Sequence, residues 1–411
     1  MLIALTKLAD IAARSFFVLL CLYALPIRST GQFGLALTLL GFFTFASGFE
    51  RYADLQRRMV GTDAVQADRL IVSTLRFYAL NYLLCLPVLF ALLLLWVQLP
   101  FLSAAMCAVI GVGEHLSNEV YRIALIAPRH RPVLFAVLVK NLSLLAIVGA
   151  TLWLQHDRFD LDWLLVTWAT VSLAGLAVIA IAFTRTWAFE SMSQARGAGL
   201  QQSSQYRASR THFMIGLVAL GSLQADRLVA GALLTLEQSG LYFRHVFLAS
   251  FAYQVFNVVS YNRIAPTVYA HTHAHRPASA KAAVRRELTW LAPAALAVIA
   301  TFYLAASPLF SGIAATRSVY PNFLAVLVLG YLVRVLADFN ALLLNGVYAE
   351  RDVFYSQAAS LVLAIALNIA LTSVFGIKGT VATLLLGSTA YFLMSSFYIR
   401  RRPSLNGPNM P

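Results

Sequence analysis

Charged residues interrupt several long apolar stretches of this sequence, and they are the best candidates for chemistry. A charge inside a membrane helix costs about 2.5–3.5 kcal/mol on insertion scales, so each one needs a partner or an aqueous cavity. Arg14, Lys140 and Arg334 fall near the middle of their stretches, as does Glu114. Guanidinium groups bind phosphate in a bidentate manner, most strongly where water is scarce. We therefore predict that these four residues line a cavity for an anionic cargo.

Charge pairing offers a second interpretation of the same residues. Side chains three or four positions apart share a helix face and can neutralise each other, which would only stabilise the helix bundle. Lys140 and Glu114 have no such neighbour, but they can pair with each other across adjacent helices. The pairs within single stretches are Asp10 with Arg14, Glu119 with Arg122, and Arg334 with Asp338.

Two aspartates are candidates for coupling to H+ or Na+. Asp226 and Asp338 lie within apolar stretches, where a carboxyl group deprived of water can bind and release a proton. Asp226 adjoins Arg227, although neighbouring residues on a helix point in different directions. The alternative role of Asp226 is to position the start of the following helix.

Other site chemistry is not indicated. The sequence has no metal-binding motif, phosphate-binding loop, nucleophile elbow or dinucleotide fingerprint, so we expect neither a metal nor a cofactor. His271, His273 and His275 alternate within a polar segment, which is more typical of a solvated loop than of a metal site.

The composition indicates an integral membrane protein. Hydrophobic residues make up 60% of the 411 residues, charged residues make up 12%, and the mean hydropathy is +0.74. A soluble domain has about 25% charged residues. Apolar stretches near the roughly 20 residues needed to cross a bilayer predict twelve transmembrane helices. Their expected bounds are 8–26, 33–49, 71–97, 100–126, 132–154, 162–184, 212–235, 240–260, 288–310, 319–344, 353–374 and 378–399.

Basic residues in the loops predict the orientation. Lys and Arg gather in the connections of one side, whereas the alternate connections hold only Arg28, Arg158, Arg317 and Lys378. Cytoplasmic loops carry the excess of Lys and Arg, so both termini are expected in the cytoplasm. The net charge of +14 then reflects loops that face anionic membrane lipids. No basic run is interleaved with aromatic residues, so a nucleic-acid partner is not expected.

Two similar segments, 206 residues apart, indicate an internal duplication. Gln32–Leu35 and Gln238–Leu241 differ at one position, and each is expected to form the turn between the first two helices of a half. Two six-helix halves in the same orientation are the plan of secondary transporters with parallel repeats. The predicted organisation is an N-terminal lobe, a cytoplasmic linker, a C-terminal lobe and a cytoplasmic tail at 1–185, 186–211, 212–399 and 400–411.

Several segments resemble a known family. Asp226–Gly231 followed by Gln238–Tyr242 resembles the helix 7–8 signature of polysaccharide flippases, in which an Asp-Lys/Arg pair precedes a small residue and an acidic or amide residue precedes Gly-x-Tyr. Arg14, Gln32–Gly34 and Gly48–Phe49 also fit this family. It is a branch of the multidrug/oligosaccharidyl-lipid/polysaccharide (MOP) exporter superfamily.

The resemblance implies an all-α polytopic membrane protein with two six-helix lobes around a central cavity. It implies flipping of an undecaprenyl-pyrophosphate-linked oligosaccharide across the bacterial inner membrane by alternating access, driven by an H+ or Na+ gradient. The product would be O-antigen, capsule or exopolysaccharide, with other polysaccharide-assembly proteins as partners. Arg14 and Arg334 would attract the pyrophosphate, and Asp226 would couple the ion.

Three other functions remain open. A drug/cation antiporter of the same superfamily would favour acidic and aromatic cavity residues, and the excess of Arg over carboxylate at depth argues against it. A membrane O-antigen polymerase or ligase, which is an enzyme, typically has a large periplasmic loop, whereas the outer connections here are short. A scaffold for polysaccharide assembly has no need for Arg14, Lys140 and Arg334 at depth.

Overall fold

The computed structural model describes residues 2–59, 63–126, 132–155, 159–185, 202–256, 260–274, 276–305, 320–402 and 405. Within these residues every regular element is a helix. Residues 186–201 of the predicted linker, and residues 403, 404 and 406–411 of the predicted tail, lie outside the described part.

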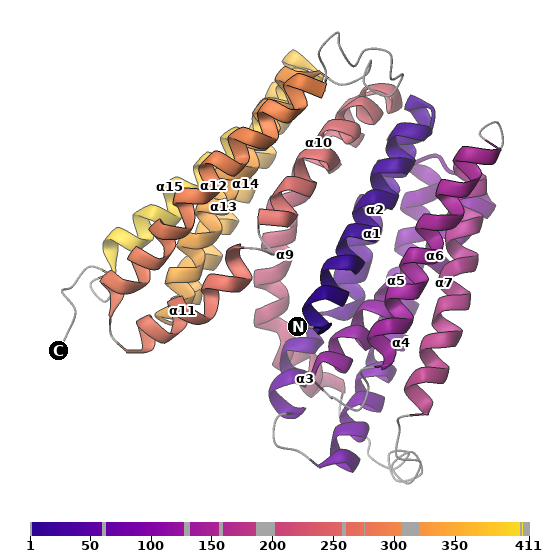
Figure 1. The fold of residues 1–411 in the computed structure, drawn as a ribbon, viewed down its shortest axis with the longest axis horizontal. Helices are drawn as coiled ribbons and strands as arrows, with labels where there is room; N and C mark the ends of the chain where they lie inside the picture. The colour runs from indigo at the N-terminus through magenta and orange to yellow at the C-terminus, as the bar shows by residue number, and fades with distance from the viewer. Residues whose placement is uncertain are drawn as a thin grey trace. The chain divides into compact units, whose positions relative to one another are not determined.

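The chain divides into two compact units, Met1–Leu217 and Val218–Pro411. The first unit contains α1 (Leu2–Ala24), α2 (Ile27–Gly48), α3 (Arg51–Met59), α4 (Ala64–Leu95), α5 (Phe101–Ile126), α6 (Pro132–Leu154) and α7 (Leu161–Thr184) (Figure 1). Helix α9 (Gln202–Leu233) crosses the boundary. The second unit continues with α10 (Leu236–Phe256), α11 (Asn262–His273), α12 (Pro277–Ala305), α13 (Pro321–Gly346), α14 (Glu350–Phe375) and α15 (Ile377–Arg401).

The order of long and short helices repeats along the chain. Two long helices, α1 and α2 or α9 and α10, are followed by a short helix, α3 or α11, and then by four long helices. The third long helix of each set contains an internal proline, Pro87 in α4 and Pro293 in α12. This repeated order supports the predicted internal duplication.

One long helix lies at the centre of each unit. Helix α5 contacts α2, α3, α4, α6 and α7, and helix α13 contacts α10, α11, α12, α14 and α15. Polar side chains on these two helices are therefore surrounded by protein, and they must find partners on the neighbouring helices.

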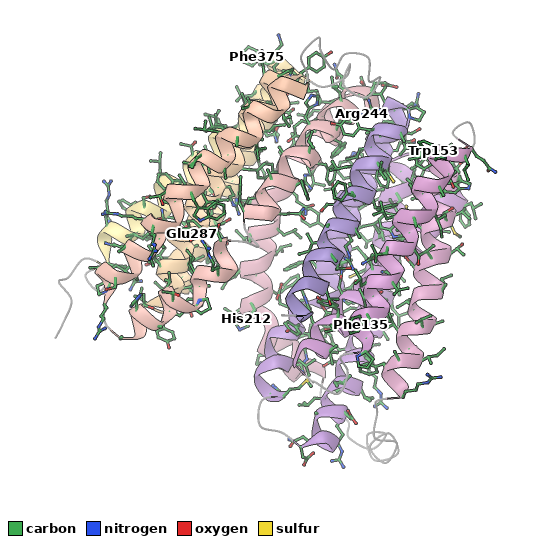
Figure 2. All side chains as sticks on the ribbon, viewed as in Figure 1. Phe135, Trp153, His212, Arg244, Glu287 and Phe375 are labelled. Carbon is green, nitrogen blue, oxygen red and sulfur yellow. The ribbon has the colours of Figure 1, made fainter. Side chains whose placement is uncertain are left out.

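Each predicted transmembrane segment overlaps one long helix, although α1, α2, α4 and α12 begin six, six, seven and eleven residues before their predicted starts. Eight helices in the described part of the chain are long and apolar enough to cross a membrane, while charged and polar residues interrupt α1, α5, α10 and α12. Large apolar side chains are exposed on the outside of the bundles, among them Phe135, Trp153 and Phe375 (Figure 2). Such exposed apolar surface suits lipid rather than water.

The two Gln-x-Gly-Leu segments are not turns, and this part of the sequence-based prediction is wrong. Gln32–Leu35 lies inside α2 and Gln238–Leu241 inside α10. Helix α1 ends at Ala24, just before Pro26, because a proline disfavours helical geometry in the residue that precedes it. The hydroxyl of Thr30 then donates to the Leu22 carbonyl oxygen at 3.2 Å, which ties the two helices together.

Helix α9 begins ten residues before its predicted start at residue 212. The hydroxyl of Tyr206 donates to Asn81 Oδ1 at 2.5 Å, and Phe213 stacks on Phe49 with 4.0 Å between ring centroids. These contacts secure a polar stretch that hydropathy alone excludes from a helix. Residues 202–211, predicted as linker, are therefore helical.

Glycine is required both in the turn between α14 and α15 and at the start of α15. Gly376 has a φ of +57°, in the left-handed region that favours glycine. At Gly379 an added Cβ would lie 2.1 Å from the carbonyl oxygen of Leu371. The two helices are thus packed backbone to backbone at this end.

Substituting Gly379→Ala is therefore expected to lower the midpoint of thermal unfolding in detergent. Overpacking of this kind costs about 1–3 kcal/mol. Gly149→Ala on α6 is the matched control, because an added Cβ there meets nothing within 4 Å. Equal midpoints for the two variants would contradict the close packing of α14 on α15.

Candidate functional site

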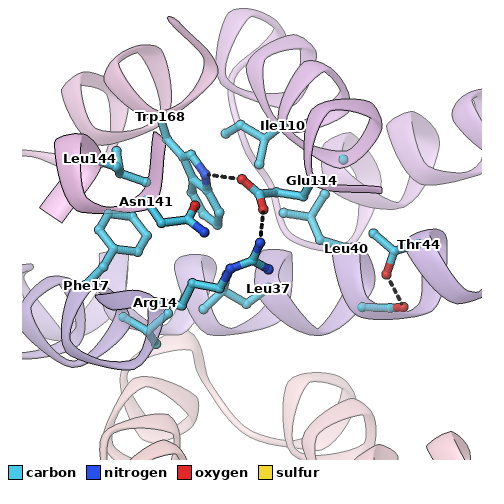
Figure 3. A pocket seen from close by; sticks show the side chains of 13 residues that line it. Arg14, Phe17, Leu37, Leu40, Thr44, Ile110, Glu114, Asn141, Leu144 and Trp168 are labelled. Carbon is cyan, nitrogen blue, oxygen red and sulfur yellow. Dashed lines mark hydrogen bonds and ion pairs between the residues drawn. The ribbon is translucent and has the colours of Figure 1, made fainter. Parts of the chain in front are cut away.

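A cavity of about 190 Å³ lies within the first unit (Figure 3). Helices α1, α2, α5, α6 and α7 supply its lining, which is mostly apolar. Arg14, Glu114 and Asn141 contribute its charged and amide groups. Two of the four residues predicted to line a cavity, Arg14 and Glu114, therefore do line this one.

Glu114 contacts four of the polar groups in and around the cavity. Its Oε1 accepts from Lys140 Nζ at 2.8 Å, from Trp168 Nε1 at 3.2 Å and from Ser172 Oγ at 3.4 Å. Its Oε2 lies 3.6 Å from Arg14 Nη2, an ion pair marked by a dashed line in Figure 3. The predicted pairing of Lys140 with Glu114 across adjacent helices is confirmed.

Asp10, Arg14, Glu114 and Lys140 form a cluster of charges, and Arg14 makes its longest contacts. Its Nε lies 3.5 Å from Asp10 Oδ2, and its Nη2 is 3.6 Å from Glu114. The amide of Asn141 donates a short hydrogen bond to Asp10. The Arg14 side chain is 32% exposed, whereas those of Asp10 and Glu114 are 12% and 14% exposed. Among Asp10, Arg14, Glu114 and Lys140, the Arg14 side chain is thus the most exposed.

Lys140 does not line the cavity. Its side chain is 1% exposed, and its Nζ also donates to Ser117 Oγ at 3.2 Å. Gly175 of α7 makes room for it, because an added Cβ there would lie 2.4 Å from Lys140 Cγ. A direct contact between Lys140 and cargo, expected from the sequence, stays a prediction.

Arg334 is buried at the centre of the second unit. Its Nη1 donates to Ser222 Oγ at 2.6 Å, and its Nε lies 3.5 Å from Asp338 Oδ1. The guanidinium carbon lies 4.5 Å from the ring centroid of Tyr391, and Tyr253 donates to Asp338 Oδ2 at 2.8 Å. The predicted pairing of Arg334 with Asp338 is confirmed, while their cargo and ion roles stay predictions.

Asp226 and Arg227 have separate partners within the second unit. Tyr242 donates a short hydrogen bond to Asp226. Arg227 Nη2 donates to the hydroxyl of Tyr331 at 3.2 Å, and its guanidinium lies 4.6 Å from the ring centroid of Phe247. Both residues are buried. The ion-coupling role predicted for Asp226 is untested.

Glu114 and Arg334 occupy equivalent places in the two sets of helices. Each lies thirteen residues after the first residue of its helix, and both helices have 26 residues. The central helix of one unit therefore carries an acid where the other carries a base. Each charge has partners on neighbouring helices.

Sequence reasoning missed the neutral partners of these charges. All of these partners are polar or aromatic residues inside apolar helices, and only the fold shows which charges they contact. They are Asn141, Trp168, Ser172, Ser222 and Tyr391. A second group of buried hydrogen bonds was also missed. In it, Tyr78 donates to Glu119, and the Tyr82 hydroxyl shares a hydrogen bond with His115 Nδ1. Arg122 pairs with Glu119 at 2.8 Å, as its spacing predicted.

Comparisons with known proteins identify the fold. No protein-family model and no curated protein matches the chain. An inward-facing multidrug resistance MATE family transporter of the MOP superfamily matches with a TM-score of 0.69 and 14% identity, covering 97% of this chain and 98% of that one. A mutant of the Vibrio cholerae MATE transporter VcmN matches with a TM-score of 0.63 and 13% identity, covering 98% and 97%.

A third solved structure broadens the comparison. A MOP superfamily transporter from Pyrococcus furiosus, described as having a binding pocket of reverse polarity that suggests a different function, matches with a TM-score of 0.62 and 12% identity over 98% of this chain and 95% of that one. The chain is thus a multi-pass membrane protein with the fold of MATE transporters of the MOP superfamily, and its predicted fold class of about twelve transmembrane helices in two lobes is confirmed.

Proposed function

We propose that this protein moves an anionic, lipid-linked cargo across the membrane by alternating access, and that the cargo is an oligosaccharide linked to undecaprenyl pyrophosphate. The transporters that share its fold support the transport step. The accessibility of Arg14 in the cavity supports an anionic cargo, and this is the observation that carries the proposal.

A guanidinium at the edge of an apolar cavity suits a pyrophosphate group. Arg14 presents several N–H donors in a planar fork, and water is limited by the surrounding Phe17, Leu40 and Leu144. The side chains of Asp10 and Glu114 are less exposed than that of Arg14. The guanidinium would repel a cationic drug in this cavity, because like charges repel.

Two transporters can share this fold while the charges that line their cavities differ. The Pyrococcus furiosus transporter is described as having reversed pocket polarity and a different function. Pocket charge therefore varies within this fold, and a site is a better guide to cargo than a fold. An Arg-bearing pocket in this chain is in keeping with that variation.

The proposal includes an orientation and an energy source. The proposed location is the bacterial inner membrane, and the distribution of Lys and Arg supports a cytoplasmic position for both termini. Asp226 is buried and accepts from Tyr242, and Asp338, whose side chain is 16% exposed, accepts from Tyr253. They are the proposed sites at which an H+ or Na+ gradient drives the cycle.

Reconstitution in proteoliposomes tests this proposal. A fluorescent prenyl-pyrophosphate oligosaccharide is placed in both leaflets, and a membrane-impermeant quencher reports how much of it reaches the outside under an imposed H+ or Na+ gradient. Movement that depends on the protein is expected. A fluorescent organic cation is tested in the same vesicles, and transport of the cation without transport of the lipid would establish the drug antiporter instead.

A further inference from the structure

We infer that Lys140 is a positioning residue that holds Glu114, so that the Arg14 guanidinium can leave the cluster and bind the cargo pyrophosphate. This inference rests on the proposed function and assigns separate roles to the two cations of the cavity. Arg14 would contact the cargo, and Lys140 would act only through Glu114.

The distances separate firm contacts from loose ones. Lys140 lies 2.8 Å from Glu114, whereas Arg14 lies 3.5 Å from Asp10 and 3.6 Å from Glu114. A contact of 3.5 Å or more between charged groups is weaker than a charge-assisted hydrogen bond of about 2.7–2.9 Å. Arg14 is therefore the member of the cluster that moves away at the lowest cost.

The departure of Arg14 leaves no carboxylate without a partner. Glu114 keeps Lys140 and also the Trp168 and Ser172 donors. Asp10 keeps the amide of Asn141. A buried charge that loses every partner is strongly destabilising, and these contacts avoid that cost. Arg14 can thus exchange its carboxylate partners for a phosphate group while both carboxylates remain hydrogen-bonded.

Lys140 itself does not reach the cavity. Its side chain is 1% exposed, its ammonium group contacts Glu114 and Ser117, and its aliphatic stem packs against Gly175. Without the ammonium, Glu114 would keep Arg14 as its cationic partner among the described contacts and would hold it more tightly. Arg14 would then bind the carboxylate in competition with the pyrophosphate.

A double-mutant cycle tests this coupling. Binding of farnesyl pyrophosphate to the purified full-length protein in detergent is measured for the wild type, Lys140→Met, Glu114→Gln and the double variant, with neutral farnesol as the reference ligand. We expect Lys140→Met to weaken binding about tenfold, or about 1.4 kcal/mol, in the wild type. In the Glu114→Gln background, the same change is expected to have less than a twofold effect.

Equal losses of binding affinity in the wild-type and Glu114→Gln backgrounds would show that Lys140 acts on the pyrophosphate directly. That result would overturn the inference but not the proposed function. A wild type that binds farnesol as well as farnesyl pyrophosphate would overturn the proposed function and the inference with it. The two failures are therefore distinguishable within one experiment.

Gly175→Ala keeps the result decisive if Lys140→Met fails to fold. The added Cβ displaces the Lys140 stem without changing any charge, and binding of farnesyl pyrophosphate is expected to weaken several-fold. Gly149→Ala, which has open space around it on the same helix as Lys140, is the control and should bind like the wild type. Wild-type affinity in Gly175→Ala would overturn the inference.

Discussion

Replacing Arg14 with glutamine is expected to reduce movement of the lipid-linked cargo in proteoliposomes at least tenfold. Hydrogen bonds to charged groups contribute about 1.5–3 kcal/mol each, and 1.4 kcal/mol corresponds to a factor of ten. Arg14→Lys keeps the charge but loses the planar fork, so its rate is expected to fall between those of the wild type and Arg14→Gln.

The fold should survive this change, because Asp10 and Glu114 keep Asn141 and Lys140 as partners. Arg207→Gln removes an equal charge from an exposed position on α9 and serves as the control. Equal transport rates for Arg14→Gln and the wild type, at matched amounts of reconstituted protein, would remove Arg14 from the cargo site.

The largest loss of stability is expected for Asp338→Ala in the second unit. It leaves the buried guanidinium of Arg334 without its carboxylate partner, although Ser222 and the ring of Tyr391 still contact it. Breaking a buried ion pair from one side costs about 3–5 kcal/mol. The midpoint of thermal unfolding in detergent measures the effect.

An ion pair with an exposed arginine provides the comparison for this variant. Asp352 and Asp338 are similarly shielded, at 15% and 16% exposed, but Asp352 pairs with Arg402, whose side chain is 41% exposed, whereas that of Arg334 is 7% exposed. An arginine that stays in water loses little with its partner, about 0–1 kcal/mol. Asp352→Ala should therefore unfold close to the wild type. If Asp338→Ala were as stable as Asp352→Ala, Arg334 would not depend on its carboxylate, and Asp338 would be free to serve the coupling ion alone.

Apolar length predicted the positions of the helices well where the whole helix lies in an apolar stretch. Helix α6 has the predicted bounds 132–154, and α7 begins one residue before its predicted start. Hydropathy failed at the start of α9, where Gln202–Thr211 is polar but is helical in the structure. A local pattern of apolar residues does not report tertiary contacts such as that of Tyr206 with Asn81.

Glycine misled the prediction of the first turn in each half. The repeated Gln-x-Gly-Leu segments were predicted as turns, yet Gly34 and Gly240 both lie inside helices, and membrane helices tolerate glycine more readily than soluble ones. The true break in the first half comes just before Pro26, because a proline disfavours helical geometry in the residue that precedes it.

The ion pairs of the candidate site were predicted from the sequence, but the neutral partners of those charges were not. Helical spacing was enough to pair Asp10 with Arg14, because both are on one helix. The hydrogen bond from Asn141 to Asp10 joins residues 131 positions apart in the chain, and no spacing rule links them. The burial of Lys140 against Gly175 likewise depends on how α6 packs on α7.

The most direct test of the proposed function is a genomic deletion followed by extraction of lipid-linked oligosaccharides and determination of the membrane face that they occupy. Complete repeat units trapped on the cytoplasmic face, together with loss of surface polymer, are the predicted result. Single units accumulating on the outer face would instead indicate a polymerase or ligase. Normal amounts on both faces would contradict a role in flipping.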